Sequence, residues 1–490
     1  MTGGSPPTDA PRLVVIGAGI AGLAAAWEAL RVPWGSEGTS PSVIVLESAD
    51  VVGGKLQSVD FRGRQVDLAA DAFLARRPEA SQLVAELGWN DRLVAPGTSG
   101  ASIYARGRLR AMPGDLVLGV PTRWWPLARS GLLSPTGLWH AAGDLWRRSP
   151  QRASVPAGSN DAAVGTLVAS RLGSEVVDRL VDPLVGGIHA GGVTNLSAAA
   201  TFPQLLAAAS APGSLMRALR PERAQNTPPS APASPVFWSL ESTTASLATR
   251  TAEALVAEGV VIETGATVTG IERVGGSWSL HLADGTRREA DAVVVAVPAH
   301  PASRLLTGWA PEAAAYLGDM TTASVGVITV AFPDSVINKT LVGTGFLVPR
   351  TTHLTTGPAL ITGVTYLDRK WPTLARADET LVRISVGRAG DTRADDLDDE
   401  ALLSRAISEF HEVLTTSGAP LETLVTRWSD AFPQYVPGHL TAVAAMESEV
   451  DALPGLALAG SAYRGVGIPA CIGSGRMAAR KLSESWGRRR

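Results

Sequence analysis

The sequence predicts an α/β protein in which a parallel β-α-β unit opens the chain, a mainly helical segment follows, and a strand-rich region comes next. Residues 12–17 are a short β-branched apolar run that leads directly into glycines and an alanine-rich stretch at residues 23–30. A second apolar run follows at residues 43–47. Two strands connected through a helix in this order pair in parallel within one sheet.

Composition limits the kinds of protein that this chain can be. Its 490 residues and 45% hydrophobic content predict two or three subdomains. The formal net charge is −3 and the basic residues are scattered, which argues against a nucleic-acid surface. The single cysteine, Cys471, excludes an internal disulfide framework and a cysteine-cluster metal site and fits a reducing cytoplasm.

The termini and the apolar segments bear on membrane association. Residues 1–12 lack the basic and apolar regions of a signal peptide, so we expect a disordered leader. No uninterrupted apolar run reaches the length of a transmembrane helix. Residues 122–146 hold four tryptophans among leucines, and two interpretations are open: helices that line an internal apolar cavity, which we favour, or side chains that enter a membrane interface.

The remaining segments predict how the domains are interleaved. Residues 78–209 show mostly helical patterns, and residues 221–235 hold five prolines, which predicts a surface loop. A helix is expected at residues 247–258 and a last helix after Gly473. Strands are expected at residues 260–263, 267–273, 278–282, 292–297, 324–332, 360–366 and 381–386, and a further helix at residues 399–415. We therefore predict a dinucleotide-binding domain from residues 12–77, 236–300 and 426–487, a helical insert with part of the substrate domain at residues 78–210, and a substrate-binding sheet domain at residues 301–425.

The glycines after the first strand form a G-x-G-x-x-G fingerprint in the strand-to-helix context of a Rossmann-type domain. The first glycine permits the sharp turn, the second lets the backbone approach a pyrophosphate, and the third lets the helix pack on the sheet. Free N–H groups at the helix N-terminus favour the anion. We assign nucleotide contacts to Gly17, Ala18, Gly19, Ile20, Ala21 and Gly22.

The second strand ends on a carboxylate that suits a ribose. Glu47 and Ser48 lie at the position where an acidic residue accepts hydrogen bonds from ribose hydroxyls. The following Gly53, Gly54 and Lys55 place a cation after a glycine pair, a pattern of flavoproteins rather than nicotinamide enzymes. Taken alone, Lys55 is better explained as an exposed loop lysine, but its neighbours favour a position near the phosphates, so the predicted cofactor is FAD.

A segment near the C-terminus is expected to contact the same cofactor as the N-terminal fingerprint. Residues 457–461 predict a buried strand that ends at Gly460, and Val466, Gly467 and Ile468 lead into a helix whose N-terminus can face the flavin ring. Cys471 lies next to this segment. We expect it to pack rather than to act as a redox thiol, because no second cysteine can resolve it.

Few other polar residues are candidates for substrate binding or catalysis. Arg76 and Arg77 offer planar cations that suit carboxylates, although a plain surface role fits them equally. His189 is a candidate base, and a packed histidine is the favoured interpretation. No Ser/His/Asp arrangement and no paired histidines at metal-ligand spacing support hydrolytic or metal mechanisms.

Four motifs resemble the porphyrinogen oxidases of haem synthesis. They read DLAADAFLARRP at residues 67–78, DPLVGGIHAG at residues 182–191, TFPQ at residues 201–204 and GVGIPACI at residues 465–472. The second and last motifs are the specific ones, and the resemblance runs from about Arg12 to Lys481. Within that family the chain is most similar to the coproporphyrinogen III oxidases of Gram-positive bacteria, with the protoporphyrinogen oxidases as close relatives.

The resemblance implies a p-hydroxybenzoate-hydroxylase-like fold, one non-covalent FAD, and the six-electron oxidation of a porphyrinogen by molecular oxygen with release of hydrogen peroxide. It implies substrate contacts for Arg77, near a propionate, and for Tyr366 and His189. A ferrochelatase is the implied handover partner. The flavin contacts that it adds to those above are Ala69, Ala70, Asp71, Ala72, Val268 and Trp428.

Some positions depart from the usual family pattern. Alanines at 69 and 70 stand where Gly-Pro is usual, Thr243 and Thr244 where a glycine is usual, Ala470 where an aspartate often follows, and His189 where Tyr or Phe is usual. We expect the alanines to admit a flavin and regard the backbone at the two threonines as the open point. Coproporphyrinogen and protoporphyrinogen both remain as substrates. An amine or carotenoid-type flavin oxidoreductase and a flavin-free binding protein are the more remote alternatives.

Overall fold

The computed structural model describes residues 10–35, 38–146, 161–220, 235–337 and 341–487. Most of the predicted leader and nearly all of the proline-rich segment at residues 221–235 lie outside these ranges. The chain divides into two compact units: unit 1 comprises Met1–Ala95, Ser234–Met320 and Leu440–Arg490, and unit 2 comprises Pro96–Ala233 and Thr321–His439. The finer three-part division, with its boundaries at residues 77, 210, 300 and 425, stays a prediction.

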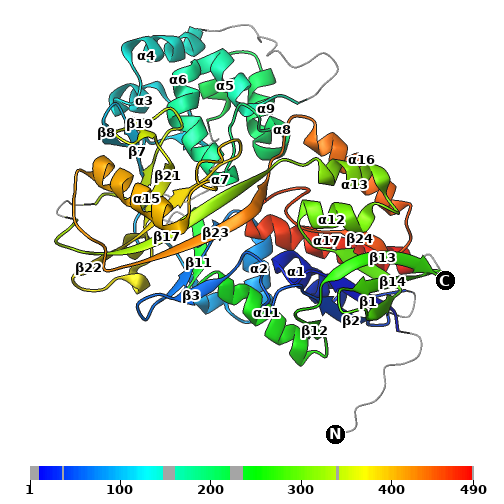
Figure 1. Cartoon of the computed structure of the whole chain (residues 1–490). Coiled ribbons are helices and arrows are strands. Elements are labelled where there is room, and N and C mark those ends of the chain that lie inside the picture. The colour runs from blue at the N-terminus through cyan, green and yellow to red at the C-terminus, as the bar shows by residue number, and fades with distance from the viewer. Residues whose placement is uncertain (1–9, 36–37, 147–160, 221–234, 338–340, 488–490) are drawn as a thin grey trace. The chain divides into compact units, whose positions relative to one another are not determined.

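Unit 1 is built on a five-stranded parallel sheet (Figure 1). Its order is β12 (Val261–Glu263), β2 (Ser42–Leu46), β1 (Arg12–Ile16), β16 (Ala292–Val295) and β24 (Leu456–Leu458). The predicted β-α-β unit is confirmed, with α1 (Ile20–Ala29) connecting β1 to β2. Strands from three distant parts of the chain therefore share one sheet.

Alternate residues of these strands pack on opposite faces, as the period of two in a strand requires. Leu13 and Val15 of β1 pack in one cluster with α1, α11 (Ala245–Ala257) and α17 (Ile468–Gly487), while Val14 and Ile16 pack in another. That second cluster includes α12 (Ala299–Leu306), α13 (Pro311–Gly318) and α16 (His439–Asp451) and the meander β13 (Val268–Val274), β14 (Ser277–Leu282) and β15 (Arg287–Ala290). The last helix begins at Ile468, earlier than predicted, because Pro469 lies in its first turn, where a missing N–H leaves nothing unpaired.

The helices α1 and α17 meet backbone to backbone in unit 1. A Cβ on Gly475 of α17 would lie 2.0 Å from the carbonyl oxygen of Ala21 and 3.0 Å from the nitrogen of Ala25. Only a glycine allows this approach. Because Ala21 belongs to the fingerprint, the contact connects the two ends of the chain at the predicted nucleotide site.

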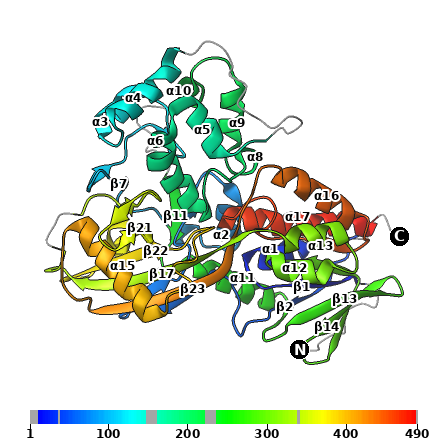
Figure 2. The same cartoon turned by 45° about the horizontal axis from the view of Figure 1, so that its top comes forward.

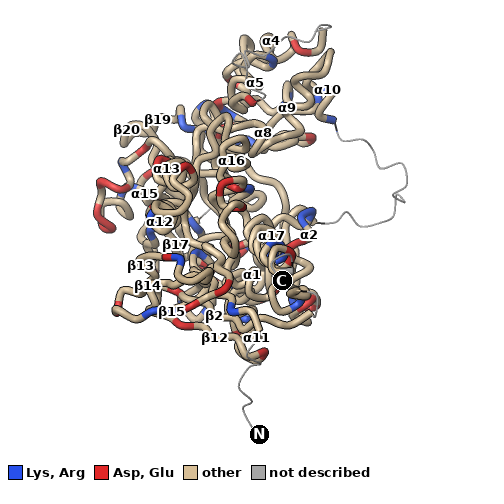
Figure 3. Tube along the Cα trace, turned by 90° about the vertical axis from the view of Figure 1, so that its right-hand side faces the viewer, with Lys and Arg blue, Asp and Glu red and all other residues tan. Residues whose placement is uncertain are grey.

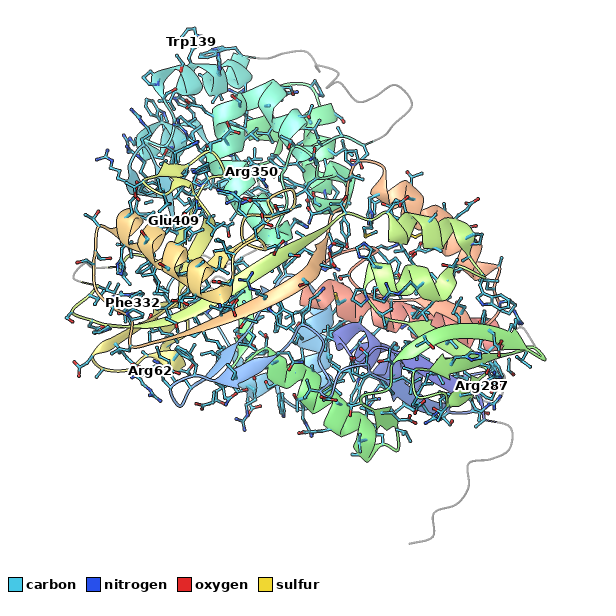
Figure 4. All side chains as sticks on the ribbon, viewed as in Figure 1. Arg62, Trp139, Arg287, Phe332, Arg350 and Glu409 are labelled. Carbon is cyan, nitrogen blue, oxygen red and sulfur yellow. The ribbon has the colours of Figure 1, made fainter. Side chains whose placement is uncertain are left out.

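Unit 2 holds a seven-stranded sheet, shown from a second direction in Figure 2. Its order is β23 (Glu422–Pro433), β17 (Thr322–Pro333), β22 (Glu379–Val386), β21 (Ile361–Tyr366), β18 (Gly345–Leu347), β7 (Ser102–Ala105) and β8 (Arg108–Ala111). Helix α15 (Asp399–Leu414) packs on this sheet and places Glu409 in the core (Figure 4). The Glu409 carboxylate accepts hydrogen bonds from the backbone N–H groups of Leu360 and Ile361, at 2.8 and 3.0 Å, so it fixes the start of β21.

A helical cluster completes unit 2, with the bounds α3 (Trp124–Ser130), α4 (Pro135–Ala142), α5 (Val164–Leu172), α6 (Ser174–Val176), α7 (Gly187–His189), α8 (Ala198–Thr201), α9 (Pro203–Ser210), α10 (Leu215–Ala218) and the π-helix η3 (Val177–Gly186). The predicted helical character of residues 78–209 is confirmed here. The helical prediction is wrong for residues 102–111, which form the antiparallel β7–β8 hairpin instead. Residues 78–86 form α2 (Pro78–Glu86), which belongs to unit 1.

The tryptophan-rich helices differ from expectation. The side chains of Trp125, Trp139 and Trp146 are 69%, 78% and 73% exposed, so the favoured interpretation, that these helices line an internal cavity, is wrong for them. Trp139 lies on the outer surface of the helical cluster in Figure 4. Among the described residues, no helix combines the length and apolar character needed to cross a membrane. Charged residues of both signs are interspersed along the chain in Figure 3.

We predict that Gly475→Ala destabilises the protein by about 2 kcal/mol, because the added methyl group overpacks a backbone contact. Gly473→Ala is the matched control on the same helix, since its Cβ would meet only the flexible Glu79 side chain at 3.4 Å. Alanine also favours a helix interior, so the control should be neutral or slightly stabilising. Thermal unfolding of the two holoproteins measures the difference, and equal melting temperatures would contradict the prediction.

Candidate functional site

The fingerprint loop, residues 17–22, connects β1 to α1 in unit 1. Gly17 has a φ of +102° and its N–H donates to the Leu46 carbonyl at 2.7 Å. A Cβ there would lie 2.8 Å from the Ala296 oxygen, and a Cβ on Gly22 would lie 1.9 Å from the Gly17 oxygen. The first and third glycines are therefore required by crowding within the protein.

Gly19, the middle glycine, is different because the space beside it is open. A Cβ at this position would meet no atom within 4 Å. Gly19 is also the N-cap of α1, where no side chain caps the helix and no acidic residue occupies the first turn. Exposed N–H groups and the positive end of the helix dipole fit an anionic pyrophosphate, which the open side of Gly19 admits.

Glu47 follows β2 and is held against the fingerprint loop. Its side chain is 8% exposed, and one carboxylate oxygen accepts a hydrogen bond from the Ala18 N–H at 2.7 Å. The other oxygen accepts from the Ala49 N–H at 2.9 Å and from the Ser48 hydroxyl at 3.2 Å. The oxygen that accepts from Ala18 has a second lone pair, so Glu47 retains acceptor capacity for a ribose hydroxyl.

The glycine pair after β2 lies directly against the fingerprint loop. The Gly53 N–H donates to the Ala18 carbonyl at 2.8 Å, and a Cβ on Gly54 would lie 3.3 Å from the Gly19 Cα. Both glycines have positive φ, at +105° and +59°. The loop that carries Lys55 is therefore placed at the same open space as Gly19.

The C-terminal segment reaches this region from the other end of the chain. Gly460 follows β24 with a φ of +125°, and its N–H donates to the Ser474 hydroxyl at 3.1 Å. Cβ atoms on Gly460 and Gly467 would meet nothing nearer than 3.9 and 3.8 Å, so both backbones border open space. Val466 and Ile468 flank Gly467 at the start of α17.

Cys471 is a buried thiol rather than a reactive one. Burial raises its pKa to about 11, and the nearby charge of Lys55 opposes that shift only in part. The thiol is therefore protonated at neutral pH, which supports the packing role. The electrostatic contact also places Lys55 next to the C-terminal segment, in agreement with the grouping of motifs predicted from the sequence.

The open point at the threonines is resolved by a hydrogen-bond network in unit 1. Thr244 has an ordinary helical backbone, with φ −65° and ψ −27°, so it needs no glycine. Its hydroxyl contacts the Asp67 carboxylate at 2.9 Å and the Ala70 carbonyl at 2.6 Å, and Asp67 also accepts from the Thr244 and Ala245 N–H groups. Thr244 thereby holds the segment that contains Ala69, Ala70, Asp71 and Ala72.

Two further predicted flavin contacts, Val268 and Trp428, lie outside the segments described above. Val268 begins β13, two residues after Ala266, whose N–H donates to the Glu47 carbonyl at 2.7 Å. Val268 therefore lies close to the Glu47 end of β2. Trp428 lies on β23 in unit 2, paired with Val325, and its contact with the flavin stays a prediction.

The predicted substrate residues are divided between the units. Arg77, in unit 1, forms two hydrogen bonds to Glu79 at 2.7 and 3.2 Å and is 47% exposed at the side chain. Tyr366, in unit 2, is 2% exposed and packs edge-on against Phe346. His189 lies in unit 2, where burial lowers its pKa to about 4. Their joint placement around one substrate stays a prediction.

Sequence reasoning missed Asp67, Ser474 and Gly475. Asp67 ends the strand β4 (Gln65–Asp67) as a buried carboxylate at the start of a quoted motif, which is a signal that the sequence offered. Ser474 and Gly475 gave no comparable signal. Gly475 packs against Ala21, which is more than 400 residues away in the chain. Ser474 accepts a hydrogen bond from Gly460, on the other side of the connection between β24 and α17.

Comparison of the chain with known proteins identifies its family. The family model described as flavin containing amine oxidoreductase matches residues 20–483. The coproporphyrinogen III oxidase of Mycobacterium leprae is 36% identical over 460 residues, 94% of this chain and 95% of the relative. The coproporphyrinogen III oxidase of Bacillus subtilis is 32% identical over 471 residues, 95% and 96% of the two chains.

A solved structure agrees with the same fold. A crystal structure from Exiguobacterium sp. 255-15, provisionally named a protoporphyrinogen oxidase, superposes with a TM-score of 0.83 at 30% identity, covering 98% of this chain and all of that one. The predicted fold class and the predicted FAD cofactor are thereby confirmed. The chain belongs to the flavin containing amine oxidoreductases, and within them to the family of the bacterial coproporphyrinogen III oxidases.

Proposed function

We propose that this oxidoreductase converts coproporphyrinogen III to coproporphyrin III in haem biosynthesis. Two observations together support the proposal. Unit 1 has the glycine loop and the Glu47 carboxylate of a dinucleotide-binding site. Relatives named coproporphyrinogen III oxidase align with nearly the whole chain. The reaction removes six electrons, with molecular oxygen as the acceptor and hydrogen peroxide as the by-product. The chemistry supplied by bound FAD is hydride acceptance and reoxidation by oxygen.

The chain's own residues supply position and charge. The open backbone at Gly19 and the free N–H groups of α1 would hold the pyrophosphate, and Glu47 would hold a ribose. Lys55 would offset phosphate charge. A porphyrinogen is apolar with anionic propionates on its rim, so its binding needs few cations, among which we propose Arg77.

We assign no general base. His189 is the candidate, but burial lowers its pKa to about 4, so the imidazole is neutral and weakly basic near pH 7. A neutral imidazole suits a packed or hydrogen-bonding role beside the substrate better than proton abstraction. Tyr366 would contribute an apolar wall.

The rival functions have less support. An amine oxidase of this fold needs exposed aromatic side chains beside the flavin, and the nearby Tyr463 is 3% exposed and packed in the core of unit 1. A flavin-free binding protein has no need of Glu47 or of open space at Gly19. A protoporphyrinogen oxidase remains the second candidate, because the Exiguobacterium structure carries that name.

We further propose a cytoplasmic location and a transient handover to a ferrochelatase. The unpaired Cys471 supports a reducing compartment. The exposed side chains of Trp125, Trp139 and Trp146 support a peripheral contact with a membrane surface.

Steady-state oxidation of both porphyrinogens by the purified holoprotein tests the substrate. We expect kcat/KM for coproporphyrinogen III to exceed that for protoporphyrinogen IX by at least about tenfold, a difference of about 1.4 kcal/mol. Porphyrin fluorescence follows both reactions. A preference for protoporphyrinogen would establish the second candidate, and turnover of neither would overturn the proposal.

We predict that Glu47→Gln weakens FAD binding by about 10- to 100-fold, because an amide presents N–H groups to the backbone donors that now contact a carboxylate. Glu263→Gln is the matched control, since Glu263 ends the adjacent strand and its side chain pairs with Arg288 at the surface. Fluorescence titration of apoprotein with FAD gives both dissociation constants. Equal affinities in the two variants would argue against the ribose role.

We predict that Arg77→Ala raises KM for coproporphyrinogen by about 10-fold or more and leaves flavin content unchanged, because a charge-assisted hydrogen bond to a propionate is lost. Arg76→Ala, one residue earlier and also exposed, should have little effect. Michaelis kinetics with a parallel flavin assay separates the two outcomes. Unchanged kinetics in Arg77→Ala would remove this residue from the substrate site.

A further inference from the structure

Three charged side chains of unit 2 form a group that we call the Arg388 cluster: Asp182, Arg350 and Arg388. Arg388 follows β22 and is 8% exposed. Its Nη2 atom is buried, and none of the described residues accepts a hydrogen bond from it. Buried donors in folded proteins are almost always paired, so this atom calls for a missing acceptor.

The acidic residues near Arg388 have other hydrogen-bond and ion-pair partners. The Arg350 Nε atom lies 3.8 Å from one oxygen of Asp182, whose other oxygen accepts a hydrogen bond from the Val193 N–H at 3.1 Å. Asp391, the next carboxylate, is already paired with Arg393 through bonds of 2.7 and 2.8 Å. Asp182 and Asp391 both act on Arg388 through their charge, but within the described ranges neither carboxylate forms an ion pair or hydrogen bond with it. Arg388 is therefore a cation without a direct acidic partner in this part of the protein.

Burial of this charge is unfavourable in the protein alone. Burial lowers the pKa of Arg388 to about 10, with a further lowering from the charge of Arg350, so the side chain is still a cation at neutral pH. A buried charge without a direct ion-pair partner is unfavourable, because no close countercharge offsets its lost hydration. Such a cost is typical of sites where a ligand supplies the missing partner.

The cluster adjoins the motif at residues 182–191. The Ala389 N–H donates to the Ala190 carbonyl at 2.7 Å, so the loop that carries Arg388 lies beside the loop that carries His189. The Nδ1 atom of His189 is also buried without a partner among the described residues. Two unpaired polar atoms thus belong to adjoining loops.

The cluster is also reachable from outside unit 2. The Arg350 side chain is 38% exposed, and Figure 4 shows it where the helical cluster meets the sheet of unit 2. Ile188, on the motif, is 48% exposed, and a Cβ on Gly187 would meet nothing within 4 Å. Arg350 is therefore the member of the cluster that an anion in solution can contact first.

We propose that Arg388, assisted by Arg350, binds a carboxylate of the porphyrinogen and makes the enzyme select a substrate with four propionates over one with two. This inference rests on the proposed function. The planar fork of an arginine matches a carboxylate, and one cation without a direct acidic partner matches one monoanion. A site built to hydrogen-bond a group rejects an analogue that lacks it, because the buried donors are then left unpaired.

Arg388→Met in the holoprotein tests the proposal, because methionine retains much of the volume without the charge. We expect kcat/KM for coproporphyrinogen III to fall by about 10- to 100-fold and that for protoporphyrinogen IX to change by less than about threefold, with full FAD content. Arg388→Lys should recover part of the loss. Arg383→Met is the matched control, since Arg383 is a buried arginine on β22, and it should leave the ratio of the two kcat/KM values unchanged.

The results of these experiments distinguish failure of the proposed Arg388 role from failure of the proposed function. If the wild-type enzyme oxidises coproporphyrinogen III and Arg388→Met keeps the same substrate ratio, the inference is overturned while the proposed function stands. If the wild-type enzyme oxidises neither porphyrinogen, the proposed function fails first. Arg350→Met replaces a partly exposed side chain and provides the same ratio test should Arg388→Met not fold, and an unchanged ratio there overturns the inference as well.

Discussion

The hydrogen bond from the Ala18 N–H to the Glu47 carboxylate is the interaction on which the nucleotide site depends. It joins the fingerprint loop to the end of β2 at 2.7 Å in a buried setting. The main chain of Glu47 extends the connection, since its N–H donates to the Glu263 carbonyl at 2.8 Å and its carbonyl accepts from Ala266. One residue therefore fixes the edge of the sheet where β1, β2 and β12 end. Displacement of this carboxylate would disturb the loop and the two strands together.

Close backbone packing extends this constraint to the C-terminus. Gly475 lets α17 lie against α1, and this contact carries Gly460 and Gly467 toward the open space beside the fingerprint loop. The influence of Lys55 on the Cys471 thiol indicates the same proximity through charge. The predicted flavin site, with residues from both ends of a 490-residue chain, thus depends on two helices approaching at a glycine.

Three buried carboxylates of this protein, those of Asp144, Glu409 and Asp67, differ from the Arg388 cluster because all their oxygens accept hydrogen bonds. Asp144, fully buried, accepts hydrogen bonds from Arg171, Ser214 and the backbone at the start of α10. Glu409 holds the start of β21, and Asp67 holds Thr244. These groups stabilise the fold because each buried oxygen has a donor. The Nη2 atom of Arg388 has no acceptor among the described residues, and the proposed ligand would supply one.

The sequence by itself determined the strand–turn–helix at residues 12–30, the position of Glu47 at the end of the second strand, and the flavin class, because these signals depend on residues close together in the chain. It also predicted the parallel β-α-β unit, the five strands of the unit 1 sheet, and three of the seven strands of the unit 2 sheet, β17, β21 and β22. It failed at the β7–β8 hairpin and at the exposed tryptophans, where burial depends on how distant segments pack. Only the tertiary structure decided that Thr244 replaces a glycine without strain, that Gly475 must be a glycine, and that the buried Nη2 atom of Arg388 has no acceptor among the residues that the structure describes. Each of these three facts is a relation between atoms that are remote in the chain, and such relations exist only once the chain has folded.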